Sequence, residues 1–171
     1  MTGVQTCALP IFIEVFYLII DSVRNVLLIL GKGQKIESPG EAQSIKSGTD
    51  ANNNSLVIKL AYGRRSFIFA GDAEFEEQKE LLCGEADIKA DILKVPHHGS
   101  RSLNEELLEQ VAAEAAVISV GAHNTFGHPA QTTLDILNHA GTRVYRTDTD
   151  GAVIIQTDGN NIDIVRGKKS E

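Results

Sequence analysis

The chain has 171 residues, of which 42% are hydrophobic and 23% charged, and its formal net charge is −7. This length and composition predict one soluble globular domain, and the acidic balance argues against a broad nucleic-acid-binding surface. A phosphodiester substrate is not excluded, because bound metal ions would add positive charge locally. The only cysteines are Cys7 and Cys83. They argue against a disulfide scaffold or a cysteine-type zinc site, so we expect no disulfide partner.

Residues 1–51 are expected to form an N-terminal segment followed by a loop. Residues 2–11 resemble a translated sequencing adapter, so the first eleven residues are expected to be non-native. Residues 12–30 carry apolar side chains at mixed spacing, which favours neither helix nor strand. The stretch lacks a continuous run of about 18 apolar residues, so we expect no membrane-spanning helix there. Residues 31–54 are rich in Gly, Ser, Asn and charged residues, which is typical of a loop.

Beyond residue 54 the pattern becomes regular, and strands alternate with helices. This alternation predicts an α/β fold. The expected strands are 55–61, 66–70, 90–95, 116–120, 143–146, 152–157 and 162–165, and the expected helices are 74–83, 103–113 and 131–140. Asn104 is a possible cap of the second helix.

The strand 66–70 is followed, through a glycine, by Asp72. A carboxylate at that position can bridge two metal ions or act as a general base. It is also well suited to be the N-cap of the helix that follows, and the residues around it, taken alone, favour that role. Both interpretations of Asp72 stay open on the residues alone.

The strand 90–95 ends in a loop that carries His97 and His98, 25 and 26 residues past Asp72. That gap fits one helix and one returning strand, so both strand ends are expected at one edge of a sheet. The two rings can serve a metal and a substrate or proton transfer, or can simply be exposed. Ser100 can hydrogen-bond substrate or cap the turn, and Lys94 is a further candidate for substrate or supporting contacts.

A third strand-end loop carries His128, between a glycine and a proline, 30 residues beyond His98. It is either a functional histidine or a capping or surface histidine before a proline. Asn124 is a candidate to orient it. Asp148 belongs first of all to a turn, although it could orient a ligand histidine. His123 and His139, by contrast, are expected to be structural or to face solvent.

These motifs together resemble the C-terminal metallo-β-lactamase-type domain of the ComEC/Rec2 family of DNA internalisation (competence) proteins. The resemblance covers about residues 52–164 and places the domain at 52–166, with a charged tail at 167–171. Pro-His-His-Gly-Ser combined with Gly-His-Pro is more specific than either motif alone. The matching segments are Phe69-Ala-Gly-Asp72, Ala90 to Ser100, Ile118 to Gly121, Asn124, Gly127-His-Pro129 and Tyr145 to Asp148 with Gly151.

The resemblance implies an αββα sandwich, with a mixed sheet flanked by helices, and a centre of two divalent ions, zinc or manganese. The substrate would be a DNA strand or another phosphodiester. Asp72 would bridge the metals and His98 would be a ligand. His97 would lie beside the reacting group or bind metal, and His128 would meet substrate or metal. The full-length protein would lie in the bacterial plasma membrane with its channel portion as a partner, while this segment would be soluble.

The chain departs from the family pattern in one respect. The family's main metal motif, His-x-His-x-Asp-His, does not occur in the sequence. We therefore expect an N-terminally truncated chain with the C-terminal half of the sandwich and a partial metal site. Such a chain would bind metal weakly and hydrolyse little by itself. The alternatives are a standalone hydrolase of the same superfamily and a non-catalytic binding or scaffold domain.

Overall fold

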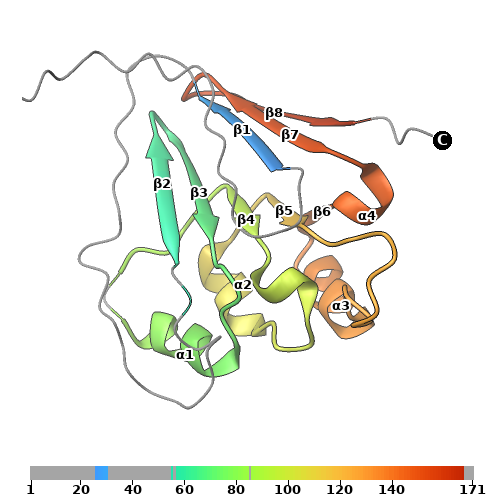
Figure 1. Ribbon diagram of the computed structural model, residues 1–171. Coiled ribbons are helices and arrows are strands. Elements are labelled where there is room, and N and C mark those ends of the chain that lie inside the picture. Colours follow the sequence, from blue (N-terminus) through green and yellow to red (C-terminus); the bar gives the residue numbers. More distant parts are fainter. Residues whose placement is uncertain (1–25, 31–54, 56, 85, 168–171) are drawn as a thin grey trace, which may run out of the picture.

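The computed structural model describes residues 26–30, 55, 57–84 and 86–167, and these contain two β-sheets (Figure 1). The larger sheet has the strand order β2-β3-β4-β5-β6, in which β2 runs antiparallel to β3 and the other neighbours are parallel. Its strands are β2 (Ile58–Tyr62), β3 (Arg65–Phe69), β4 (Ile92–Lys94), β5 (Ala115–Ile118) and β6 (Arg143–Arg146). The smaller sheet has the order β1-β7-β8, with β1 (Val26–Leu30), β7 (Val153–Thr157) and β8 (Ile162–Arg166).

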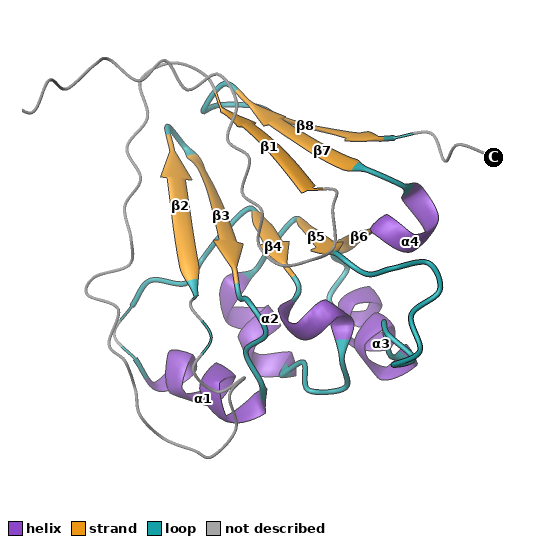
Figure 2. Cartoon of the chain, in the orientation of Figure 1, coloured by secondary structure: helices purple, strands orange, loops and turns teal. Residues whose placement is uncertain are grey.

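Helices cover one face of the larger sheet, and the smaller sheet lies over the other face (Figures 1 and 2). The helices are α1 (Phe75–Cys83), α2 (Glu105–Val111), α3 (Gln131–His139) and the short α4 (Thr147–Asp150), with a 3₁₀ turn at Pro96–Gly99. The described residues thus form three layers, of helices, sheet and sheet. The expected α/β fold with a mixed sheet flanked by helices is confirmed.

The side chains of the larger sheet alternate between two cores, as the two-residue period of a strand requires. Ile68 and Leu93 pack among the helices, whereas their neighbours Phe67 and Ile92 pack against the smaller sheet. Both faces are therefore buried. Strands buried on both faces read as continuous apolar runs, and this explains why β4 and β5 were predictable from hydrophobicity alone.

The expected elements are present, and most differ from expectation only at their ends. The undecided stretch 12–30 contains a strand at 26–30. The expectations for residues 1–25, 31–54 and 168–171 lie outside the described residues. Asn104 caps α2 as expected, since its side chain accepts a hydrogen bond from the Glu106 N–H at 2.9 Å.

The N-cap interpretation of Asp72 is wrong. Helix α1 begins at Phe75, and its N-cap is Glu74, two residues beyond Asp72. The reason is local: the Ala73 N–H bonds to the carbonyl of Ala70 at 3.1 Å, so the chain makes a turn before the helix can begin. Asp72 lies in that turn, and its carboxylate is not used in capping α1.

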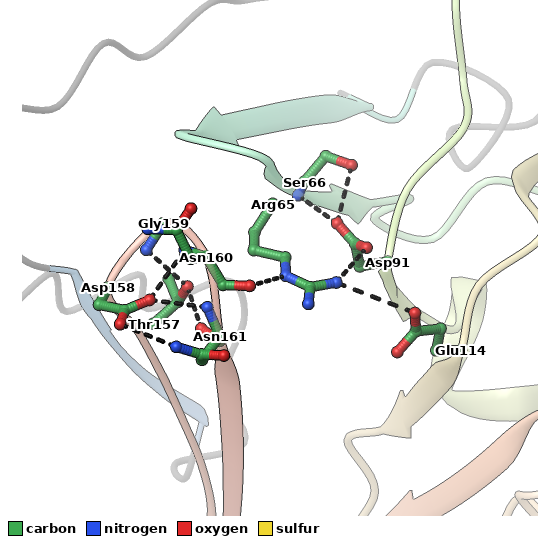
Figure 3. Close-up of polar contacts among 9 residues, drawn as sticks. All are labelled: Arg65, Ser66, Asp91, Glu114, Thr157, Asp158, Gly159, Asn160 and Asn161. Atoms are coloured by element: carbon green, nitrogen blue, oxygen red, sulfur yellow. Dashed lines mark hydrogen bonds and ion pairs between the residues drawn. The ribbon is translucent and has the colours of Figure 1, made fainter.

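At the amino ends of the parallel strands a polar cluster ties the two sheets together (Figure 3). The carboxylate of Asp91 accepts from the Ser66 N–H at 2.6 Å and pairs with Arg65 at 3.0 Å. The Arg65 guanidinium also lies 3.8 Å from Glu114. This cluster lies at the edge opposite to the histidine loops, so it supports the fold and leaves the other edge for the site.

None of the helices in the described part of the chain is long and apolar enough to cross a membrane.

Candidate functional site

The carboxyl ends of β3, β4, β5 and β6 lie at the same edge of the larger sheet because these strands are parallel neighbours. Phe69 is in register with Lys94, Lys94 with Val117, and Ile118 with Arg146. The loops that follow β3, β4 and β5 are drawn in teal in Figure 2, apart from the 3₁₀ turn. In α/β sheets ligands bind at this edge. The expectation that Asp72 and the histidine pair share one sheet edge is confirmed.

His98 and Asp72 face each other across this edge. The Nε2 atom of His98 lies 3.6 Å from Oδ1 of Asp72. The other ring nitrogen, Nδ1, lies 2.7 Å from the carbonyl oxygen of Ser119. A carbonyl only accepts, so Nδ1 carries the proton, and in the neutral form of the ring the lone pair of Nε2 is on the side of Asp72. A histidine that binds metal is usually oriented in this way.

His97 is paired with a residue that the sequence interpretation did not select, Glu74. The Glu74 carboxylate and Nδ1 of His97 are hydrogen-bonded, and both side chains are about one-quarter exposed. The bond at Nδ1 leaves Nε2 as the ring atom available for proton exchange. The one signal in the sequence was the position of Glu74, two residues after Asp72, at which the resembling segment ends.

The backbone of the histidine loop is held in an unusual conformation. His97 and His98 both have positive φ angles, 42° and 53°, followed by Gly99 at 80°. Residues other than glycine seldom adopt this region, and where they do, the surrounding structure must hold them there. The Gly71 carbonyl supplies part of that support, because it accepts from the His97 N–H at 3.1 Å and from Nζ of buried Lys94 at 3.2 Å.

His128 lies beside the histidine pair. Its ring centroid is 5.6 Å from that of His97, in an edge-on arrangement. Its Nδ1 atom is buried and has no hydrogen-bond partner among the described residues. Burial, followed by the neighbouring His97 and His98, lowers the pKa of His128 below its ordinary value of 6.5. The neutral ring is therefore favoured.

Asn124 braces the loop that carries His128. Its side-chain oxygen accepts from the His128 N–H at 3.0 Å, and its nitrogen donates to the carbonyls of His128 and Gly121 at 2.7 and 3.1 Å. Asn124 therefore acts on the loop backbone rather than on the imidazole ring. His123 and His139 are exposed, as expected.

Two of the remaining candidates have other partners. The Ser100 hydroxyl is hydrogen-bonded to the hydroxyl of Ser102 at 2.6 Å, and the backbone carbonyl of Ser100 accepts a hydrogen bond from Thr133. Ser100 therefore stabilises the turn. Asp148 accepts from Nε and Nη2 of Arg146 at 3.0 and 2.6 Å. Burial acts to raise the pKa of Asp148, but the hydrogen bonds and charge of Arg146 outweigh it and lower the pKa. The atom that orients His98 is the Ser119 carbonyl.

An open cleft of about 500 Å³ adjoins the site. Its walls include Glu74 and His128, each of which contacts His97. Arg101 and Phe126, two side chains that the sequence interpretation did not select, also line it. The other lining residues are Ser100, Ser102, Gly127 and Ala130.

The residues at this edge fit part of a metal site. Two ligands of one tetrahedral zinc ion lie roughly 3.4 Å apart, close to the observed 3.6 Å between His98 and Asp72. The described residues contain no group of three or more His, Cys, Asp and Glu side chains arranged to hold a metal ion. Since protein sites normally use three or four ligands, a complete site needs further donors.

The fold and the site together define an α/β protein with two layered sheets and a histidine–carboxylate cluster at the carboxyl edge of the larger one. No family model matches the chain. It is 43% identical over 103 residues to ComE operon protein 3 of Bacillus subtilis, a match covering 60% of this chain and 13% of that protein. It is 31% identical to Recombination protein 2 of Haemophilus influenzae over 68% of this chain and 15% of that protein.

A third relative is Competence protein ComA of Neisseria gonorrhoeae, which is 29% identical over 67% of this chain and 16% of that protein. The homologues of this chain therefore include competence proteins, and the expected resemblance is confirmed at that level. The matched part spans only about one-seventh of the length of these relatives. The metallo-β-lactamase-type domain stays a prediction.

Proposed function

We propose that this chain forms part of a metal-dependent phosphodiester-hydrolysing domain of a DNA-uptake protein. The observation that carries the proposal is the orientation of His98, whose Nδ1–H donates to Ser119 while Nε2 faces Asp72. The similarity to competence proteins supports the DNA-uptake context. In the full-length protein the domain would be joined to a channel portion in the plasma membrane.

Asp72 and His98 would hold one face of a divalent zinc or manganese ion. The remaining ligands of this ion, and the ligands of a second ion, would come from a His-x-His-x-Asp-His segment of the kind that the family resemblance implies. Bound metal would supply a Lewis acid and an activated water.

The residues of this chain then have separate tasks. Glu74 fixes the ring of His97 through Nδ1, so that Nε2 can take a proton from the attacking water or give one to the leaving oxygen of the scissile phosphodiester. His128, neutral because of its lowered pKa, lies against His97 and can accept a hydrogen bond without adding positive charge. Asn124 keeps His128 in place through the backbone.

The test begins with metal binding to the 171-residue chain, measured by titration calorimetry with Mn²⁺ and Zn²⁺. We expect weak binding that Asp72→Asn and His98→Gln each reduce about tenfold or more. The matched control is His139→Gln, because His139 is exposed and lies at the end of α3. Equal affinity in all four proteins would contradict the assignment of Asp72 and His98.

The second test is hydrolysis of bis-(p-nitrophenyl) phosphate and of single-stranded DNA. The chain is assayed alone and joined to a His-x-His-x-Asp-His segment from a relative. We expect little activity from the chain alone and metal-dependent activity from the joined protein, which Asp72→Asn abolishes. Absence of activity in the joined protein, with metal bound, would favour a non-catalytic binding or scaffold domain.

A further inference from the structure

The cleft beside the histidines contains a large exposed aromatic side chain. Phe126 is 81% exposed, although it belongs to a loop braced by Asn124. Its ring stacks on that of His128, with centroids 6.1 Å apart and an angle of 19° between the planes. An aromatic ring left in solvent on an ordered loop, next to the candidate reacting groups, can act as a stacking platform for a planar ligand.

The same cleft contains a cation. Arg101 is exposed, comes from the loop that follows the histidine pair and lines the cleft with Phe126. It is close enough to His128 to contribute to the lowered pKa of that histidine. In a chain with a net charge of −7, a guanidinium that lines the same cleft as an exposed flat ring is a specific local feature. Proteins that bind single strands combine cations for the phosphates with aromatic rings for the bases.

We infer that Phe126 and Arg101 form a subsite for an unpaired nucleotide, in which a base stacks on Phe126 and the adjoining phosphate binds Arg101. The inference rests on the proposed function and narrows its substrate class from phosphodiesters in general to single-stranded nucleic acid. In a duplex the bases are already stacked on each other, so the ring of Phe126 has no free base face to contact. The carboxylate of Glu74 lies in the same cleft, but its hydrogen bond to His97 reduces its repulsion of the phosphates.

The test is fluorescence anisotropy of the 171-residue chain with labelled oligothymidylate of about ten nucleotides, a usual site size, in EDTA. An abasic oligomer with the same number of phosphates is the comparison ligand. We expect Phe126→Ala to weaken oligothymidylate binding at least about fivefold and to leave abasic binding unchanged, with recovery in Phe126→Trp. Arg101→Gln should weaken both ligands by the same factor and reduce the salt dependence of binding.

The matched control is Phe75→Ala, which removes the exposed ring of α1, a residue that does not line the cleft. Three results would overturn the inference: no binding of oligothymidylate by the wild type, equal loss of both ligands in Phe126→Ala, or equal losses in Phe126→Ala and Phe75→Ala. Metal-dependent hydrolysis of bis-(p-nitrophenyl) phosphate by the joined protein reports on the proposed function separately. Base-dependent binding without hydrolysis would support the subsite and contradict the proposed enzymatic function. Hydrolysis without base-dependent binding would support the enzymatic function and contradict the subsite.

Discussion

Arg65, at the start of β3, donates its Nε–H to the carbonyl oxygen of Asn160 in the β7–β8 turn at 2.6 Å (Figure 3). The two residues are 95 positions apart in the sequence. The same guanidinium is paired with Asp91 on the larger sheet. One side chain thus connects both sheets at the edge away from the histidines, and its loss should reduce stability without touching the candidate site.

Replacing this side chain gives the first prediction. Arg65→Met keeps the apolar stem but removes the bond to Asn160 and leaves the partly buried Asp91 with fewer partners. We expect a loss of about 1–3 kcal/mol in the free energy of unfolding, measured by urea denaturation. Arg64→Met is the control, because Arg64 is exposed and its backbone N–H, which bonds to Gly159, is retained. Equal losses in both variants would show that the Arg65 contacts contribute nothing specific.

The β2–β3 turn gives a second prediction, since it packs directly on the β7–β8 turn. A Cβ atom on Gly63 would lie 2.5 Å from the carbonyl oxygen of Gly159, and Gly63 has a φ of +60°. Gly63→Ala should therefore cost about 2–4 kcal/mol through the backbone clash and the left-handed conformation together. Gly141→Ala should cost only about 1 kcal/mol, because Gly141 has a φ of +70° but no atom within 4 Å of its Cβ position. Thermal and urea unfolding of the two variants measure the difference, and similar losses would mean that the turn can move.

A fully buried glutamine carries the third prediction. Gln78 donates to the carbonyls of Ala73 and Ser102, at 2.8 and 3.0 Å, and accepts from the Asn104 N–H at 2.8 Å. Gln78→Leu keeps a similar size but leaves two buried backbone groups and one part-buried carbonyl without these partners, so we expect a loss of about 2–4 kcal/mol in urea unfolding. Gln131→Leu, at an exposed position, should change stability by less than about 0.5 kcal/mol. A small effect at Gln78 would indicate that water replaces its hydrogen bonds.

The lowered pKa of His128 predicts a pH dependence of stability. Its folded-state pKa lies below 6.5 because of burial and of His97 and His98, while Glu74 opposes the shift and Arg101 adds to it. The unfolded state therefore binds the proton first as pH falls. The contribution of His128 to the free energy of unfolding is complete above about pH 6.5 and is lost as the pH falls through the folded-state pKa. His128→Gln should reduce the fall in unfolding free energy between about pH 7.5 and pH 5. An unchanged fall would show that other groups govern this range.

Much of the fold could be predicted from residue patterns, and the reasons lie in particular strands. The run around Ile92 and Leu93 is apolar on both faces because both faces of the strand are buried. The strand could therefore be predicted from its hydrophobicity alone. Asn104 predicted the start of α2, because a capping side chain bonds to the backbone of its own turn and so leaves a local signal in the sequence. The pairing of β1 with β7 could not be predicted, since parallel partners far apart in the chain leave no local signal.

In the candidate site, too, some features could be predicted from the sequence and others could not. The positions of Asp72 and His98 were predictable because loops after parallel strands share an edge. The pairing of His97 with Glu74, and the role of the Ser119 carbonyl, depend on positive φ angles at His97 and His98 that no residue type requires. Phe126 was overlooked because an isolated aromatic residue in a loop shows its exposure only once the loop is folded.

The order of strands in the larger sheet has a consequence for biosynthesis. From β2 to β6 the spatial order equals the chain order, so each strand leaving the ribosome can join a neighbour that is already made. The loops that carry Asp72, the histidine pair and His128 are all complete once Arg146 has been synthesised. The inner faces of Phe67 and Phe69, however, stay uncovered until Val153 and Ile155 follow. During that interval the nascent chain presents an apolar surface to chaperones, and translation of the last two strands conceals it.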